Sequence, residues 1–192
     1  MIALAAAATA FAQFPSGLSV GAGYVSNTKK AEMKTPVSNS TETSTLGGFY
    51  INADYNIPIA DFGLGVAPGI YFDYVTEDDS KEGNIGIPVN FNFSIPVADI
   101  IKIVPYLGPT FQYGLFSKED DKNVYKESKE VDMKYNHFQL FLGGGVAVDI
   151  ADIVRISFGY DFGLIKRINE SEAGASVKMT EKNLHFGVAY LF

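Results

Sequence analysis

The side chains able to carry acid–base or nucleophilic chemistry are few in this chain. None of its 192 residues is Cys, so cysteine nucleophiles, zinc–thiolate sites and disulfides are excluded. His137 and His185 are the only histidines available as general bases. Ser117 begins the segment 117–136, which His137 directly follows. Glu119 or Asp132 would supply the acid of a hydrolytic triad. No Gly-x-Ser-x-Gly motif accompanies them, so we predict no catalytic residues and no enzymatic activity.

Two acidic pairs, Asp78-Asp79 and Asp120-Asp121, present oxygen ligands of the kind that divalent cations prefer. Neither pair has the spacing of an EF-hand loop, and both stand in strongly charged segments. We interpret both as solvated, and we predict no metal site and no cofactor. The formal net charge of −7 also argues against a nucleic-acid partner, because nucleic-acid binders normally carry a basic face.

The elements that would position these residues are indicated by a regular alternation of apolar and polar side chains. In residues 154–164, for example, one face consists of Val154, Ile156, Phe158, Tyr160, Phe162 and Leu164. Eight such runs, each about 9 to 13 residues long, predict strands at 17–26, 47–57, 62–74, 85–95, 104–116, 137–149, 153–165 and 183–192. At ~3.3 Å per residue and a tilt near 45°, each strand crosses an apolar band of roughly 25 Å.

The connections between the predicted strands alternate in length. The long, charged connections are 27–46, 75–84, 117–136 and 166–182. The short connections are 58–61, 96–103 and 150–152. This alternation predicts an up-and-down series of hairpins with all tight turns at one end of a barrel. Long loops at one end and short turns at the other are typical of outer-membrane barrels.

The composition of the second face decides between a soluble barrel and a barrel embedded in lipid. A soluble barrel would present Lys, Glu and Thr to water and keep its apolar side chains inside. Here every Lys and every Glu falls outside the predicted strands, and Gly, Asn and Ser dominate the face opposite the apolar one. We therefore place the branched and aromatic side chains against lipid. Aromatic residues near both strand ends fit two girdles at the membrane interfaces.

Four charged residues within the predicted strands share the small, polar face: Asp54, Asp73, Arg155 and Asp161. Buried charges need partners, so we predict a structural network in the lumen in which Arg155 meets one or more of the aspartates. Pro68 and Pro109 fall in the middle of strands, where each forfeits a ladder hydrogen bond. We expect β-bulges at both prolines.

The first twelve residues are apolar and too few to span a bilayer, and they end in Ala10-Phe11-Ala12, a small-x-small pattern that signal peptidase cleaves. We predict a signal peptide over 1–12, export of the protein, and a single barrel domain over 13–192. The sequence has no stretch of 18 or more apolar residues, which excludes a transmembrane helix.

With these features, residues 17–192 resemble the OmpA/OmpX-like family of eight-stranded outer-membrane β-barrels. The most specific element is the C-terminal run His185-Phe186-Gly187-Val188-Ala189-Tyr190-Leu191-Phe192, with a final Phe and an aromatic residue two positions before it. The resemblance implies that the outer-membrane assembly machinery recognises this strand through Phe186, Val188, Tyr190 and Phe192. It also implies an all-β fold, an antiparallel up-and-down transmembrane barrel in the bacterial outer membrane, surrounded by lipid and lipopolysaccharide.

The leading functional prediction is a monomeric surface protein with a structural or adhesion-type role. Eight strands leave an interior that side chains fill, so the lumen is expected not to conduct. An extracellular ligand would then be bound by the loops 117–136 and 166–182. In 117–136, apolar side chains at every second position predict a hairpin that extends beyond the membrane. A partner's strand could pair with the edge of this hairpin. Two alternatives stay open: a narrow porin-like channel past Arg155 and Asp161, and a lipid-modifying enzyme built on His137.

Overall fold

The computed structural model describes residues 17–35, 38–119, 122–124, 136–172 and 175–192. The predicted signal peptide (1–12) and most of the 117–136 segment therefore lie outside the described residues. Within the described ranges, no helix is long and apolar enough to cross a membrane.

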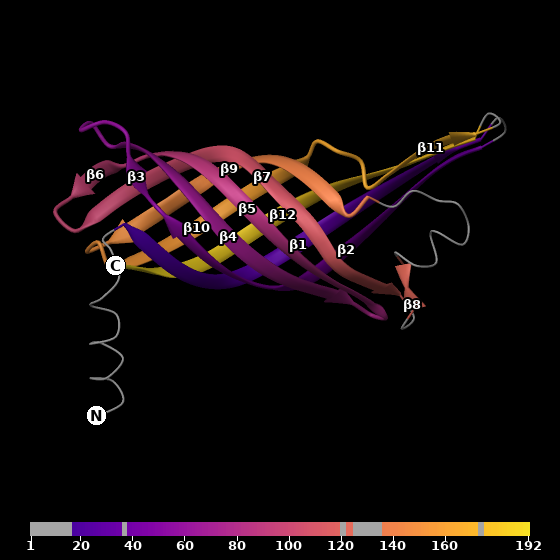
Figure 1. Ribbon diagram of the computed structural model, residues 1–192, viewed down its shortest axis with the longest axis horizontal. Helices are drawn as coiled ribbons and strands as arrows, with labels where there is room; N and C mark the ends of the chain where they lie inside the picture. Colours follow the sequence, from indigo (N-terminus) through magenta and orange to yellow (C-terminus); the bar gives the residue numbers. More distant parts are fainter. Residues whose placement is uncertain (1–16, 36–37, 120–121, 125–135, 173–174) are drawn as a thin grey trace, which may run out of the picture.

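Eight long antiparallel strands form a closed barrel (Figure 1). They are β1 (Leu18–Lys34), β2 (Asn39–Tyr55), β4 (Leu64–Glu77), β5 (Ser80–Phe93), β7 (Ile101–Glu119), β9 (Phe138–Ile150), β10 (Val154–Gly163) and β12 (Ala175–Leu191). Consecutive long strands pair with each other, and β1 closes the barrel against β12. The predicted eight-stranded up-and-down barrel is confirmed. In the described ranges, four short strands flank it: β3 (Ile57–Pro58), β6 (Ile95–Ala98), β8 (Lys122–Asn123) and β11 (Ile168–Glu172).

Several strands extend further at the outer end than the alternation predicted. β1 and β2 stay paired as far as Lys34 and Asn39, and β4 and β5 as far as Glu77 and Ser80. The expected long loops 27–46 and 75–84 are therefore mostly hairpin. Beyond the apolar band neither face of a strand has to be apolar, so the alternation disappears while the main-chain hydrogen bonds continue.

The two mid-strand prolines cause no bulge, so that expectation was wrong. The β4–β5 register is the same before and after the gap that follows Pro68, where Pro68 pairs with Val89 and Tyr71 pairs with Gly86. Pro109 pairs with Leu142 within a continuous β7–β9 register. Pairs are missing beside each proline, between Pro68 and Tyr71 on β4 and between Leu107 and Thr110 on β7. The strands thus accommodate a lost N–H donor by leaving the ladder locally unpaired. Register shifts occur elsewhere, at Gly83/Asn84 and at Pro96/Ala98.

The barrel is apolar outside and polar inside, as the composition of the two faces predicted. Large apolar side chains such as Ile51, Leu107 and Phe158 are about half exposed on the outer wall. Inward-facing Gln112 and Gln139 have almost no exposed surface. The apolar belt is therefore available to lipid, and the polar side chains are enclosed by the strands.

At the outer end, four strands continue as a sheet beyond the rest of the barrel (Figure 1). We call this the projecting sheet. It comprises residues 27–34 of β1, 39–45 of β2, 168–172 of β11 and 175–183 of β12. Pairing between β2 and β4 is confined to Gly47–Asp54 on the β2 side. Residues 39–45 of β2 thus form a sheet edge that pairs with β1 alone among the described strands.

Candidate functional site

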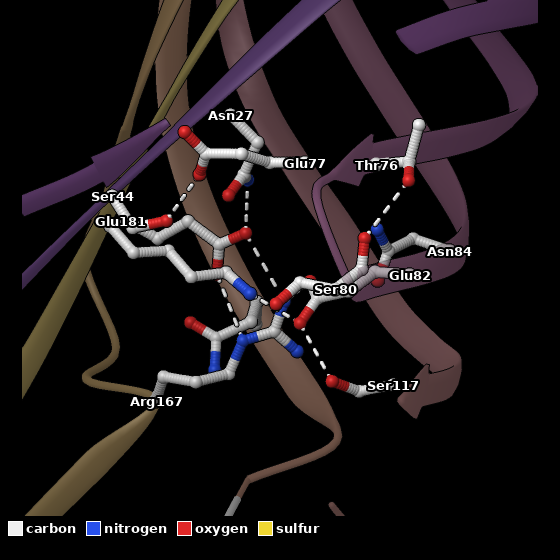
Figure 2. A network of polar contacts seen from close by, with 12 residues as sticks. Asn27, Ser44, Thr76, Glu77, Ser80, Glu82, Asn84, Ser117, Arg167 and Glu181 are labelled. Carbon is white, nitrogen blue, oxygen red and sulfur yellow. Dashed lines mark hydrogen bonds and ion pairs between the residues drawn. The ribbon is translucent and has the colours of Figure 1, made fainter. Parts of the chain in front are cut away.

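Four charged side chains meet inside the barrel near its outer end: Lys29, Glu82, Arg167 and Glu181. We call them the mouth cluster. Arg167 is fully buried, and its Nε and Nη2 donate to Oε2 and Oε1 of Glu181 at 2.9 and 3.1 Å (Figure 2). The same guanidinium lies 3.7 Å from Glu82 Oε2, and Lys29 Nζ donates to Glu82 Oε1. Two cations and two carboxylates therefore balance each other across the lumen.

Neutral side chains add hydrogen bonds to this cluster. Asn27 Nδ2 donates to Glu181 and, at 2.6 Å, to Asn183 Oδ1. Ser117 Oγ donates to Glu82 Oε1 at 2.7 Å (Figure 2). A buried charge is tolerated when a partner and hydrogen bonds are supplied, and these contacts supply them for every carboxylate oxygen of the cluster except Glu82 Oε2, which among the described residues has only the 3.7 Å contact with Arg167. The cluster ties β1, β5, β7 and β12 to the segment that enters β11.

Sequence analysis missed the mouth cluster because its members stand in segments predicted to be loops. Lys29, Glu82 and Glu181 each lie two residues beyond an inward-facing asparagine, namely Asn27, Asn84 and Asn183. Side chains two apart on a strand share a face, so the inward row simply continues into the charged segments. Following that parity past the end of the apolar row would have found these three residues.

A second charged group lies nearer the short turns, around Arg155. Its Nε and Nη2 donate to Oδ1 and Oδ2 of Asp149 at 2.7 and 2.9 Å, and its Nη1 lies 4.0 Å from Asp54 Oδ1. Asp149 was not among the predicted site residues. It stands directly opposite Arg155 across the β9–β10 hairpin, so the hairpin register was the missing signal.

The other two predicted network residues have different partners. The carboxylate of Asp73 is buried and accepts a hydrogen bond from Asn84 Nδ2 at 2.7 Å. Asp161 Oδ2 lies 3.3 Å from His185 Nδ1. The structure thus brings Arg155 together with Asp54 and leaves Asp73 and Asp161 at separate places in the lumen.

A cavity of about 140 Å³ lies in the lumen, and no mouth-cluster residue lines it. Its wall includes Asp54, Arg155, Asp161 and His185. This volume has room for several water molecules. The cavity is therefore a small pocket below the mouth cluster that is large enough to be hydrated.

Three tyrosines in the lumen lie over glycines of other strands. A Cβ at Gly187 would lie 2.0 Å from Tyr50 Oη, and one at Gly86 would lie 2.3 Å from the Tyr71 ring. Tyr106 lies in the same way over two glycines, Gly145 and Gly159. Glycine at these positions is required by the close approach of the rings.

The residues considered for hydrolysis are not brought together. Ser117 Oγ is buried in the mouth cluster, on Glu82. The His137 ring stacks on the exposed ring of Tyr113 at a centroid distance of 5.3 Å, with Nδ1 2.9 Å from the Gly114 carbonyl oxygen. Asp132 lies outside the described residues.

The acidic pair Asp78-Asp79 forms the turn between β4 and β5, where Asp78 has a φ of 46°. Asp120-Asp121 lies outside the described residues. In the parts of the chain that the structure describes, no group of three or more His, Asp or Glu side chains is arranged to hold a metal ion.

The strand implied to be the assembly signal closes the barrel. Phe186, Val188 and Tyr190 point outward and are each about half exposed. The Phe192 N–H donates to the Leu18 carbonyl at 2.9 Å, so the last residue is held against β1. Recognition of these side chains by assembly machinery stays a prediction.

Comparison with known proteins gives a family match over the whole chain. Residues 1–192 match the model for "Outer membrane protein beta-barrel domain". No curated protein matches the chain in sequence. Among solved structures, Neisserial surface protein A (NspA) is 15% identical, with 92% of this chain and 98% of that chain covered and a TM-score of 0.53. This likeness shows the fold.

Two further solved structures are similar at lower scores. Ail, the attachment invasion locus protein of Yersinia pestis, is 12% identical, with 93% of this chain and 100% of that chain covered and a TM-score of 0.41. The outer membrane enzyme PagL is 10% identical, with coverages of 83% and 97% and a TM-score of 0.47.

Proposed function

This chain belongs to the outer membrane protein beta-barrel domain family, and from that premise we propose that it is a non-conducting surface protein that binds its partner through the projecting sheet. It resides in the bacterial outer membrane. The observation that carries the proposal is the mouth cluster, which crosses the lumen with buried ion pairs. With the lumen obstructed, the surfaces left for function are those outside the membrane.

Opening a path through the lumen would require the mouth cluster to separate. Arg167 would have to leave both Glu181 and Glu82, and these charges would lose their partners while still enclosed by the strands. Breaking one buried ion pair typically costs about 3–5 kcal/mol. Such a path would therefore be rarely populated. The cavity below the cluster supports at most a dead-end pocket, which favours the surface role over a channel.

The projecting sheet offers a partner a free strand edge. Residues 39–45 of β2, Asn-Ser-Thr-Glu-Thr-Ser-Thr, are all exposed and pair with β1 alone among the described strands. Such an edge presents unpaired N–H and C=O groups, which an extended segment of another protein can bind by adding a strand. The predicted binding segment 166–182 contributes β11 and part of β12 to the same sheet. We propose no enzymatic reaction, which the separation of Ser117 from His137 supports.

We expect the refolded full chain to give no unitary conductance steps in planar bilayers. Insertion is verified separately by a heat-modifiable, protease-protected band, and a general porin in the same bilayer shows that the assay detects an open lumen. Reproducible steps from the inserted chain would overturn the non-conducting assignment and would favour the channel.

A proline that removes an outward-pointing N–H group from the free edge is expected to weaken partner binding at least tenfold. Successive residues of a strand direct their N–H groups to opposite sides, so one of Glu42 and Thr43 bonds to β1 while the other points to the free edge. Extended peptides that bind the membrane-inserted chain are first selected from a displayed peptide library. We predict that these peptides bind at least tenfold more weakly to one of the two variants Glu42→Pro and Thr43→Pro than to the parent chain. In that variant the amide hydrogens of the β1–β2 hairpin should stay protected from exchange.

The second proline variant is the matched control, because it disturbs the pairing with β1 and not the free edge. Selection of no peptide, or binding that survives both substitutions, would contradict binding by strand addition. The conductance result stands independently of this outcome.

A further inference from the structure

The outward face of the projecting sheet is basic, although the chain carries a net charge of −7. We call it the basic face. It is formed by alternate residues of β1 and β12 that continue the lipid-facing rows of these strands: Lys30, Glu32, Lys34, Lys178 and Lys182. Four lysines and one glutamate give this face a formal charge of +3.

Hydroxyl groups lie between the lysines. The strand register places Lys30 between Thr180 of β12 and Thr43 of β2. It places Lys182 next to Thr28. Ammonium and hydroxyl groups are all hydrogen-bond donors, so an anion with several oxygen atoms is the ligand that this arrangement fits.

The single carboxylate leaves most of the positive charge uncompensated. Lys30 Nζ lies 2.7 Å from Glu32 Oε1. The hydrogen bond from Lys30, its charge, and the nearby charges of Lys34 and Lys178 hold the pKa of the Glu32 carboxyl below its usual range. Among the described residues, no acidic side chain forms an ion pair with Lys34, Lys178 or Lys182. Three lysines are thus available to an external anion.

The basic face begins just above the membrane interface. Exposed Tyr24 and Phe186 stand opposite each other on β1 and β12 and mark the outer aromatic girdle. Lys182 lies four residues beyond Phe186, and Lys30 lies six beyond Tyr24. At ~3.3 Å per residue and a tilt near 45°, they stand about 9 and 14 Å above the girdle. Lys182 Nζ is also 5.7 Å from the centre of the exposed Phe162 ring, which ties the lowest lysine to the lipid-facing wall.

From this placement we propose that the basic face binds the phosphate groups of lipopolysaccharide in the surrounding outer leaflet, and so holds the projecting sheet close to the membrane surface. Charge complementarity points to a phosphorylated ligand. Continuity with the lipid-facing wall points to a neighbouring lipid as its source, because the outward rows of Tyr24 and Phe186 run directly into the rows that carry the lysines. The inference depends on the outer-membrane location and not on the proposed strand addition.

Lysine acylation followed by mass spectrometry tests this proposal on the full chain refolded into bilayers. Three bilayers are compared: phosphatidylcholine alone, phosphatidylcholine with lipopolysaccharide, and phosphatidylcholine with dephosphorylated lipopolysaccharide. We expect acylation of Lys34, Lys178 and Lys182 to slow at least fivefold only with the phosphorylated lipid, since each lysine near an anionic surface contributes about a fivefold factor. High salt should remove the protection. Lys102, at the short-turn end, should not change.

A pair of double variants separates a specific site from general electrostatic attraction. In Lys30→Gln/Lys178→Gln, the protection of Lys34 and Lys182 should fall about fivefold or more. In Lys81→Gln/Lys118→Gln, which removes the same charge from the paired rim of β5 and β7, their protection should be retained. Equal loss in both variants would overturn the proposal.

The bilayer comparison also identifies the source of the anion. Protection in phosphatidylcholine alone would mean that burial in the bilayer covers the lysines, which overturns the proposal. Equal protection by a soluble phosphorylated saccharide added to phosphatidylcholine bilayers would assign the face to a soluble anion and would likewise overturn the lipid assignment.

Discussion

Replacing Arg167 by Gln is expected to lower the free energy of unfolding by about 3–5 kcal/mol, the usual cost of removing one partner from a buried ion pair. Arg167 has no exposed surface and holds Glu181 through two hydrogen bonds (Figure 2). Without the guanidinium, Glu181 would keep a buried negative charge, and among the described residues only Asn27 would donate to it. The measurement is urea unfolding of the refolded chain in detergent micelles, followed by circular dichroism.

Two control variants show whether the loss comes from an orphaned charge. Arg167→Met/Glu181→Met removes both partners and leaves the Lys29–Glu82 pair balanced, so it should lose much less stability than Arg167→Gln. Lys102→Gln breaks the exposed pair with Asp152 and should cost at most about 1 kcal/mol. A single variant as stable as the parent, or a double variant no better than the single, would show that the mouth cluster does not hold the outer end together.

Replacing Gly86 by Val is expected to destabilise the barrel by about 3 kcal/mol. A Cβ at Gly86 would lie 2.3 and 2.4 Å from two ring carbons of Tyr71 and 2.6 Å from its hydroxyl oxygen, and Tyr71 is buried with its hydroxyl donating to Gln112 Oε1 at 2.7 Å. The ring would have to move and lose that hydrogen bond, which adds about 1 kcal/mol to an overpacking cost of about 1–3 kcal/mol. The same urea titration measures the effect.

A second substitution separates a clash with the side chain from a clash with the backbone. Tyr71→Leu removes the ring atoms that the new Cβ meets, so Gly86→Val should cost less in the Tyr71→Leu background than in the parent. Gly108→Val is the contrasting case, because its Cβ would lie 2.0 Å from the Val89 carbonyl oxygen, which Tyr71→Leu does not relieve. Strictly additive losses for Gly86→Val and Tyr71→Leu would contradict packing of this ring on this glycine.

The positions of the strands, and which face of each strand points to lipid, could be predicted from the sequence because both depend on a local pattern. In residues 154–164, the lipid on one side requires large apolar side chains and the crowded lumen on the other requires small or polar ones, so the two kinds alternate along the strand. The hydrogen bonds between strands do not alter that requirement. The inward position of Arg155 follows from the same period of two. The family resemblance of the C-terminal strand rested on the same alternation together with its final aromatic residues.

Which charges meet was decided by the tertiary structure alone. Asn27 and Glu181 are separated by 154 residues and Lys29 and Glu82 by 53, and they meet only because β1 closes the barrel against β12 and the strands keep their registers. A period of two says which way a side chain points but not its height in the lumen, so the sequence could not tell that Arg155 would bind Asp149. Beyond the apolar band, water on both sides of a strand removes the alternation itself, so only the folded chain revealed the projecting sheet.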